Sequence, residues 1–437
     1  MKMEFTYQDF LDNYYGTPLL LPIAPLEPKR CIDQGKFPVT EEEINFKIKT
    51  TKDALTERMG GEYFSKFDRA RTLSLGYANS VFPAYRMLHL DLACEDWLSL
   101  VDFHKGFGRD HSVHQPLTAY IICKLLGGGK ENAGFEICGE TLMKKALDAF
   151  NDIGCQYLRD RLAFYDPASP LLQGDRNLWR IVFYQTAIIT AMYHDLGYPW
   201  QFIERMHDFL KDDILLCGRL KYDKHGAVNP IVSSYISAHK DELMFRPFYD
   251  YGKGGRTTAH ISEKVFEKYL HESHGLPGAL AYWAYNDEYH TDAGERTAGL
   301  IKFCREWSCL AILMHDMQKA YAQPGSGFAR LDFKTDPLSF VISLADTLED
   351  FNRPNATIKA DAGIGCKISY SFPSLSVELE ENRGVAELKY SIVPDEIENQ
   401  EKFKRDDQRN LFNAGGYFDL ASIGLTSLKI ECKKDDE

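Results

Sequence analysis

The sequence lacks paired cysteines, long apolar runs and an amino-terminal signal core, and each absence argues against a class of protein. Its ten cysteines are scattered between Cys31 and Cys432 without a CxxC pair, which disfavours a disulfide framework or a zinc ribbon. No segment approaches the roughly 20 apolar residues that span a bilayer, and the first ten residues carry no apolar core. We therefore expect a cytoplasmic protein with reduced thiols and no membrane association.

The sequence also has fewer basic than acidic residues. The chain has 51 Lys and Arg against 64 Asp and Glu, which gives a formal net charge of −13. A surface this acidic repels a phosphate backbone, so we expect no binding to duplex nucleic acid. A local pocket for a small anion and assembly into a homo-oligomer are both compatible with this charge.

Two kinds of periodicity divide the 437 residues. Apolar residues at helical spacing continue to residue 353, and after residue 354 short runs rich in Val, Ile, Tyr and Ser alternate at period two. We therefore predict a mainly α-helical protein in three parts: an N-terminal helical extension packed on the core (1–103), a helical domain (104–354) and a small α+β C-terminal subdomain (355–437). The expected helices are 41–55, 88–100, 109–126, 140–151, 178–196, 200–210, 230–239, 259–270, 277–285, 296–322, 337–351 and 401–412. The expected strands are 366–372, 375–379, 386–392 and 428–432.

Histidine placement carries the strongest chemical signal. Two His-Asp pairs lie late on apolar helical segments, His194-Asp195 in AMYHDLG and His315-Asp316 in ILMHDM. The first pair ends the apolar stretch IVFYQTAIITAMYHD, where a buried charge without a partner is costly. A divalent metal would serve both groups, because it neutralises the carboxylate and binds the imidazole lone pair.

Three further segments place His or Asp in comparable settings. His111 and His114 are three residues apart on one helical face, and His260 opens a helix after a glycine-rich stretch. Asp346 lies inside the apolar helix FVISLADTLEDF, where a carboxylate is unexpected. In chain order these segments give His, His-Asp, His, His and Asp on five predicted helices.

This order resembles the HD-domain superfamily of metal-dependent phosphohydrolases. RDHSVHQPLTAY is similar to the family's first-helix histidine segment, AMYHDLGYP to its HD segment and PLSFVISLADTLEDFNRP to its final helix. TTAHISEKVF and AILMHDMQKA are similar to the segments that bind the second metal in the binuclear branches. The resemblance covers residues 104–353. It departs from the family in the long gap between the first two segments and in Tyr198, where several members carry Lys.

The resemblance implies an HD-type helical bundle that holds one or two divalent metals. The implied ligands are His111, His194, Asp195 and Asp346 for the first metal, and His260 and His315 for the second, with Asp195 bridging. Such a set suits Fe²⁺, Mn²⁺, Ni²⁺, Co²⁺ or Zn²⁺ and does not choose among them.

Other residues near these segments receive lesser roles. The family segment reads His-Ser followed by an apolar residue, which favours His111 as the ligand and leaves His114 one turn away, beside the ligands or as a proton donor. Asp316 is expected to be structural or to accept a hydrogen bond from an imidazole. The histidines expected to be exposed, because they lie in a polar stretch, are His271, His274 and His290. The basic residues that adjoin the motifs, as phosphate contacts or as solvated surface charge, are Arg109, Lys319 and Arg353.

Three functions remain open at this point. The resemblance favours an enzyme that hydrolyses a phosphomonoester or phosphodiester of a nucleotide or similar small anion, with a hydroxide bridging the metals as the nucleophile. HD-domain di-iron oxygenases use the same order of ligands to activate O₂. A non-catalytic nucleotide-sensing module, with residues 355–437 as a partner surface, is the third hypothesis.

Overall fold

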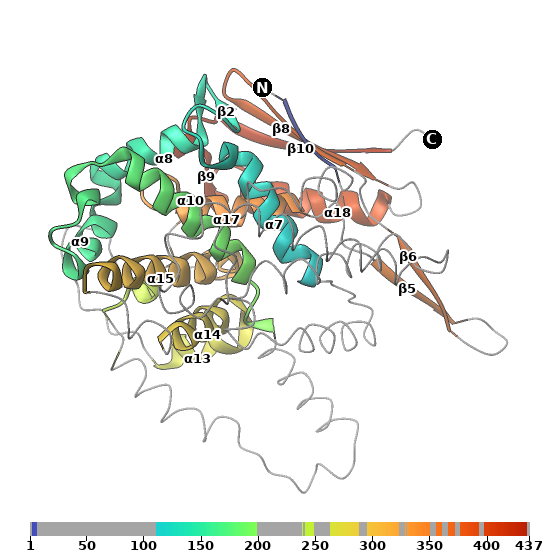
Figure 1. Cartoon of the computed structure of the whole chain (residues 1–437). Helices are drawn as coiled ribbons and strands as arrows, with labels where there is room; N and C mark the ends of the chain where they lie inside the picture. Colours follow the sequence, from blue (N-terminus) through green and yellow to red (C-terminus); the bar gives the residue numbers. More distant parts are fainter. Residues whose placement is uncertain are drawn as a thin grey trace, which may run out of the picture.

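The computed structural model describes residues 2–6, 111–198, 238, 241–248, 263–287, 295–322, 328, 330–349, 355–360, 366–371, 376–392 and 397–434. The described residues are mainly α-helical (Figure 1), as the sequence predicts. The expected helices 41–55, 88–100, 200–210 and most of 230–239 lie outside this described part. None of the described helices is long and apolar enough to cross a membrane.

Four helices form the centre of the molecule and pack against one another. They are α7 (His111–Leu125), α10 (Arg176–Tyr193), α15 (Glu295–His315) and α17 (Pro337–Leu348). Where α10 and α15 meet α8 (Leu142–Asn151) lies a cluster of large buried aromatic side chains, in which Phe150 stacks on Trp179 at 4.0 Å and Phe183 lies 5.8 Å from Trp307, measured between ring centroids. Burial of such rings is the main source of stability in a helical core.

Capping side chains begin two of these helices. The Asp175 carboxylate accepts a hydrogen bond from the Leu178 amide at 3.0 Å, which starts α10. The Asp336 carboxylate accepts one from the Ser339 amide at 3.2 Å, and Pro337 occupies the first position of α17, where its missing N–H costs nothing. The sequence places both starts within two residues of where the structure has them.

The remaining helices surround this centre. Their bounds are α8 (Leu142–Asn151), α9 (Gln156–Tyr165), α13 (Glu263–Glu272), α14 (Gly275–Asp287), α16 (Gln318–Tyr321) and α18 (Ile397–Asp407). The single helix expected at 296–322 is broken into α15 and α16, because the chain turns at Asp316, whose carboxylate accepts a hydrogen bond from the His274 amide at 2.8 Å. Helix α9 is absent from the sequence prediction, since it buries little more than Leu158 and Leu162.

Three glycines in a row end α7. Gly127, Gly128 and Gly129 have φ values of 58°, 61° and 77°, in the left-handed region that side chains disfavour. A Cβ on Gly127 would lie 2.3 Å from the carbonyl carbon of Ala133, so only glycine fits this turn. The glycine run predicts this end correctly.

A four-stranded sheet joins the two ends of the described chain. Its order is β1 (Lys2–Thr6), β7 (Ser376–Asn382), β8 (Val385–Ile392) and β10 (Ser427–Lys434). β1 and β8 are antiparallel to β7, and β10 is parallel to β8. The other strands are β2 (Glu136–Ile137) with β3 (Glu140–Thr141), β4 (Leu331–Asp332) with β9 (Phe418–Asp419), and β5 (Asn355–Ala360) with β6 (Cys366–Ser371).

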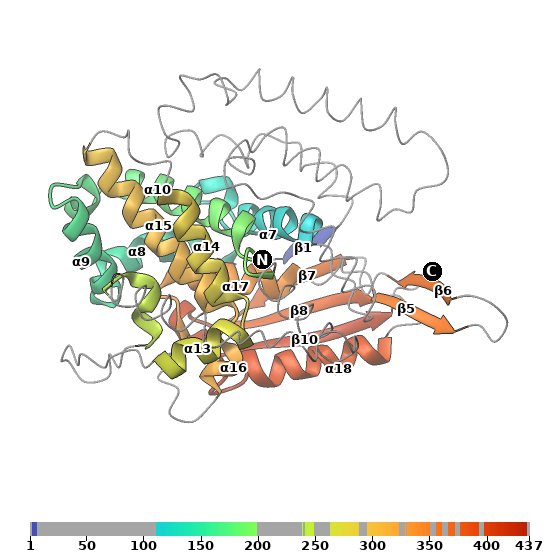
Figure 2. The ribbon, with the colours of Figure 1, turned by 90° about the horizontal axis from the view of Figure 1, so that it is seen from below.

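One face of the sheet packs on the helices, and Figures 1 and 2 place α17 and α18 beside it. Strand β1 lies in the range 1–103 that we expected to be helical. It is a strand because Phe5 is fully buried and pairs with Val377, about 370 residues further along the chain. A five-residue segment contains no local pattern that predicts such a distant contact. The rest of 1–103 lies outside the described part, and the division into three domains stays a prediction.

Candidate metal centre

Three helix ends and one helix beginning meet at a cluster of His and Asp side chains. His114 lies in the first turn of α7, His194 directly follows α10, His315 ends α15 and Asp346 lies in the last turn of α17. His274 joins them from the short turn between α13 and α14. The C-terminal ends of α10, α15 and α17 therefore converge, and the partial negative charge of helix C-termini favours a cation between them.

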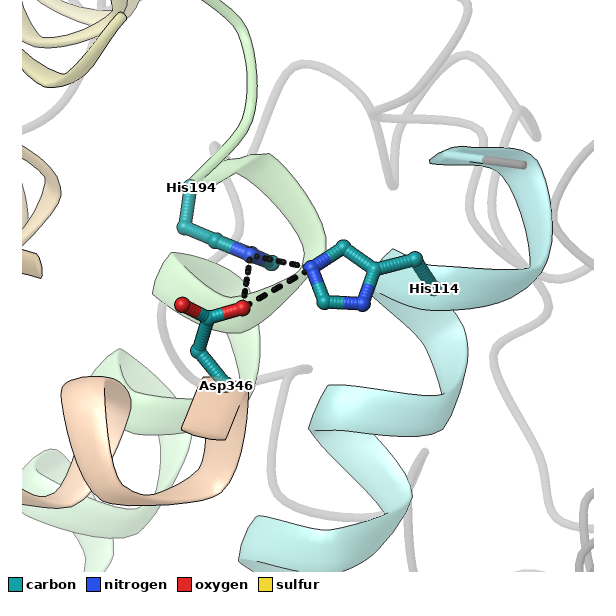
Figure 3. Close-up of side chains that lie close together, drawn as sticks. All are labelled: His114, His194 and Asp346. Atoms are coloured by element: carbon teal, nitrogen blue, oxygen red, sulfur yellow. Dashed lines mark hydrogen bonds and ion pairs between the residues drawn. The ribbon is translucent and has the colours of Figure 1, made fainter. Parts of the chain in front are cut away.

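The first group consists of His114, His194 and Asp346, whose ligand atoms all lie within 4.8 Å of one another (Figure 3). His114 Nε2 is 3.0 Å from His194 Nε2 and 3.0 Å from Asp346 Oδ1. His194 Nε2 is 3.6 Å from the same Asp346 oxygen. The Asp195 Oδ2 atom is 3.3 Å from His114 Nε2 and completes this side.

The second group shares Asp195 with the first. Asp195 Oδ1 is 3.5 Å from His194 Nε2, 3.5 Å from His315 Nε2 and 3.2 Å from His274 Nε2. His274 Nε2 and His315 Nε2 are 2.9 Å apart. One carboxylate, 5% exposed as a residue, thus contacts both groups: Oδ2 faces His114, and Oδ1 faces His274 and His315 with His194 beside them.

All four imidazoles are held by the ring nitrogen that points away from the cluster. His194 Nδ1 is 2.7 Å from the Ala191 carbonyl and His315 Nδ1 is 2.5 Å from the Ile312 carbonyl, the same i−3 arrangement in both His-Asp pairs. His274 Nδ1 is 2.9 Å from Asp316 Oδ2, and His114 Nδ1 forms a short contact with the Glu349 carboxylate. Each of these acceptors can take an Nδ1 proton, and a neutral ring protonated there turns an Nε2 lone pair towards the others.

The donor set fits divalent metal ions. The Nε2 atoms of His114 and His194 are 3.0 Å apart and those of His274 and His315 are 2.9 Å apart, and a cation bound by the lone pairs of each neutral pair would stabilise this arrangement. Four carboxylates surround the cluster with a formal charge of −4, which two divalent ions would balance; they are Asp195, Asp346, Glu349 and Asp316. Imidazole nitrogens held by a carboxylate or carbonyl on the far side are a recurring feature of protein metal sites.

The same contacts shift the pKa values of residues in the cluster. Burial opposes the charged form of Asp346, but hydrogen bonds from His114 and His194 outweigh it and hold the pKa of Asp346 well below its usual range. Burial also opposes a charged His274, yet the neighbouring Asp316 carboxylate raises the pKa of His274 well above its ordinary value. The cluster therefore attracts positive charge, as protons or as metal.

The structure brings some of the predicted site residues together, and others lie elsewhere or outside the described residues. His194, Asp195, His315 and Asp346 come together as the resemblance implies. His111 begins α7, but its side chain lies outside those described, and the structure brings His114 into the position that we had expected for His111. His260, Arg109 and Arg353 lie outside the described residues, as does His290. Lys319 is exposed on α16.

The expectation that His274 is exposed is wrong. Its side chain is only 13% exposed, contacts Asp195 and His315, and stacks on the Tyr198 ring with centroids 4.2 Å apart. The local polarity of HESHG is misleading because the segment docks on the His-Asp turn of α10. Gly197 permits this contact, since a Cβ there would lie 1.8 Å from the His274 carbonyl oxygen. The glycine after His194-Asp195 is the signal that could have indicated a close neighbour.

Sequence reasoning also missed Glu349. It is 1% exposed, lies one helical turn after Asp346 and holds His114. The spacing of three residues in LADTLED places both carboxylates on one helical face, which is the signal that was available. Asp316 accepts from an imidazole, as expected, and the imidazole is that of His274.

Comparison of the chain with models of protein families, with curated proteins and with solved structures found no match. The geometry of the cluster is therefore the main evidence for its chemistry.

Proposed function

We propose that the protein is a binuclear metal-dependent phosphohydrolase of the HD type. The observation that carries the proposal is the position of Asp195 between the two groups, with Oδ2 facing His114 and Oδ1 facing His274 and His315. One ion would be held by His114, His194, Asp195 and Asp346, and the other by Asp195, His274 and His315. The order His, His-Asp, His, His, Asp is kept, with His114 and His274 in place of His111 and His260.

The proposed reaction is hydrolysis of a phosphomonoester or phosphodiester bond in a nucleotide or similar small anion. When bound, the metals would lower the pKa of a coordinated water and neutralise charge on a phosphoryl oxygen. The protein's own residues orient this chemistry. Glu349 and Asp316 hold the rings of His114 and His274, and the carbonyls before His194 and His315 hold the other two. The net charge of −13 does not exclude an anionic substrate, since two divalent ions add +4 at the site.

The test begins with metal content. We expect protein loaded with Mn²⁺, Co²⁺ or Ni²⁺ to hold two ions per chain and to turn over a member of a panel of nucleotides, cyclic nucleotides and generic phosphoesters. Asp195→Asn should lower kcat at least about 100-fold, because it removes the charge that both ions share. Asp148→Asn, at an exposed carboxylate of α8, is the matched control and should change nothing.

Other outcomes separate the alternatives. Two bound ions without turnover of any phosphoester would contradict hydrolysis. Bound iron with O₂ consumption would favour a di-iron oxygenase on the same ligands. Tight nucleotide binding without any reaction would favour a sensing module. We propose likewise that the helices form an HD-type bundle with a small α+β appendage at residues 355–437.

A further inference from the structure

Two buried tyrosines connect the C-terminal segment to the helices that end at the candidate metal centre. The Tyr417 hydroxyl donates a hydrogen bond to the Met314 carbonyl at 2.5 Å, and the Tyr390 hydroxyl donates one to the Thr347 carbonyl at 3.0 Å. Met314 directly precedes His315, and Thr347 directly follows Asp346. Each hydroxyl therefore fixes a peptide group next to a proposed ligand.

These two hydrogen bonds matter because both carbonyls lie in the last turn of a helix. The last four carbonyls of an α-helix have no partner in the helix itself and need one from elsewhere. Met314 lies in the last turn of α15 and Thr347 in the last turn of α17. The Met314 carbonyl also accepts a longer bond of 3.3 Å from the Met317 amide, so the tyrosine supplies its shorter contact. A fixed last turn fixes the direction in which the ligand side chain leaves the helix.

Tyr417 is itself held firmly. It is 1% exposed and immediately precedes β9, and its carbonyl accepts a hydrogen bond from the Leu331 amide at 2.8 Å. The Arg330 guanidinium donates to the carbonyls on either side of it, those of Gly416 and Phe418, both at 2.9 Å. Burial, together with the nearby Asp316 and Asp336 carboxylates, raises the pKa of Tyr417 well above its ordinary value, so the hydroxyl keeps the proton that it donates.

Tyr390 is held by the sheet and by α18. It lies on β8, where it pairs with Val377 on one side and Cys432 on the other. Lys404 of α18, 3% exposed, places its ammonium 4.3 Å from the centre of the Tyr390 ring. The sheet, α18 and α17 therefore meet at this one side chain.

We infer that Tyr417 and Tyr390 are positioning residues for the metal centre, through which the segments 376–392 and 397–434 hold His315 and Asp346 in place. The inference rests on the proposed function. Tyr417 then affects the binding of the ion held by His274 and His315, and Tyr390 affects the binding of the ion held by His114 and Asp346. On this inference, the two described segments help to determine the affinity of the metal centre for its ions.

The experiment is a Co²⁺ titration of the full chain, followed by visible absorption, with metal content measured separately. The variants are Tyr417→Phe, Tyr390→Phe and the control Tyr184→Phe. Tyr184 is 1% exposed and donates to Cys123 Sγ at 3.1 Å, but it lies ten residues before His194 on α10, about 15 Å along the helix. Each of the three variants loses a buried hydroxyl and the hydrogen bond that it donates.

We expect Tyr417→Phe to weaken one of the two Co²⁺ binding steps about fivefold and Tyr390→Phe to weaken the other by a similar factor, the effect of one hydrogen bond. Tyr184→Phe should weaken neither step. In a His274→Ala background, which leaves one ion, Tyr390→Phe should still weaken binding and Tyr417→Phe should not. Melting curves of the metal-free proteins will separate this effect from a general loss of stability.

Unchanged Co²⁺ binding in both tyrosine variants, with two ions bound by the wild-type chain, would overturn this inference and leave the proposed function standing. No Co²⁺ bound by the wild-type chain would overturn both. Should Tyr417→Phe fail to fold, Arg330→Lys serves in its place. It loosens the loop that carries Tyr417 and should weaken the same binding step, and normal binding in this variant would also overturn the inference.

Discussion

Glu349 shows how one buried side chain can determine what a histidine does. Its carboxylate contacts His114 Nδ1 and leaves Nε2 to face His194 and Asp346. Without this acceptor the His114 ring could turn or protonate at Nε2, and either change would remove a lone pair from the cluster. The residue has no role in the sequence motif, yet the geometry of the first group depends on it.

We expect Glu349→Ala to lower the affinity for the ion at His114 by about 10- to 100-fold, the usual effect of losing such a partner. Glu349→Gln keeps a carbonyl acceptor at the same place and should cost less. The measurement is a metal titration of both variants, with Glu378→Ala, a partly exposed carboxylate on β7, as control. Equal affinity in wild type and Glu349→Ala would show that Glu349 does not orient His114.

His274 offers a direct count of the metals. We expect His274→Ala to bind one ion per chain where the wild type binds two, because His315 and Asp195 alone give the second ion too few protein ligands. Elemental analysis of the dialysed protein measures this. Glu272→Ala, at an exposed position two residues away, should retain both ions. Two tightly held ions in His274→Ala would refute its assignment as a ligand.

At the scale of the elements, glycines decide how closely the helices approach. A Cβ on Gly275 at the start of α14 would lie 2.7 Å from the Leu313 carbonyl oxygen of α15. A Cβ on Gly197 would collide with the His274 carbonyl oxygen. These two positions bring the His-Asp turn, the His274 turn and the end of α15 together, and the second ligand group exists only because they touch.

Gly197→Ala should therefore both destabilise the protein and weaken the second ion. The new methyl group must push the His274 backbone away, since contacts near 1.8 Å do not occur. Denaturant unfolding and metal titration together measure the two effects. Gly139→Ala, in the turn between β2 and β3, is the comparison: its φ of 79° should cost roughly 1–2 kcal/mol, but nothing lies within 4 Å of the new Cβ, so metal binding should be unchanged. Loss of stability without loss of the second ion in Gly197→Ala would contradict this account.

At the scale of the whole molecule, the sheet ties the chain ends to the helical centre. Strand β1 pairs with β7, and the Lys124 ammonium of α7 donates to the Glu4 carbonyl at 2.9 Å. The same sheet meets α17 through Tyr390. The helices that carry His114 and Asp346 are therefore both attached to one sheet, whose strands come from residues far apart in sequence.

Phe5 tests how much this attachment contributes. Its side chain is fully buried, so Phe5→Ala should lower the free energy of unfolding by about 3–5 kcal/mol, the usual cost of such a cavity. Urea unfolding followed by circular dichroism measures it. Lys2→Ala, at the exposed end of the same strand, should change stability little. A similar small effect for Phe5→Ala would mean that β1 docks only weakly.

The sequence by itself determined the mainly helical architecture, the glycine end of α7, the later strands and four members of the cluster, His194, Asp195, His315 and Asp346. These follow from periodicity and from charges placed in apolar helices, which are local signals. Only the tertiary structure decided that His114 and His274 complete the groups, that Glu349 and Asp316 orient them, and that β1 joins the sheet. Each depends on contacts between residues 40 to 370 positions apart. Local composition cannot encode such contacts, because they form only when segments far apart in the sequence meet in the folded chain.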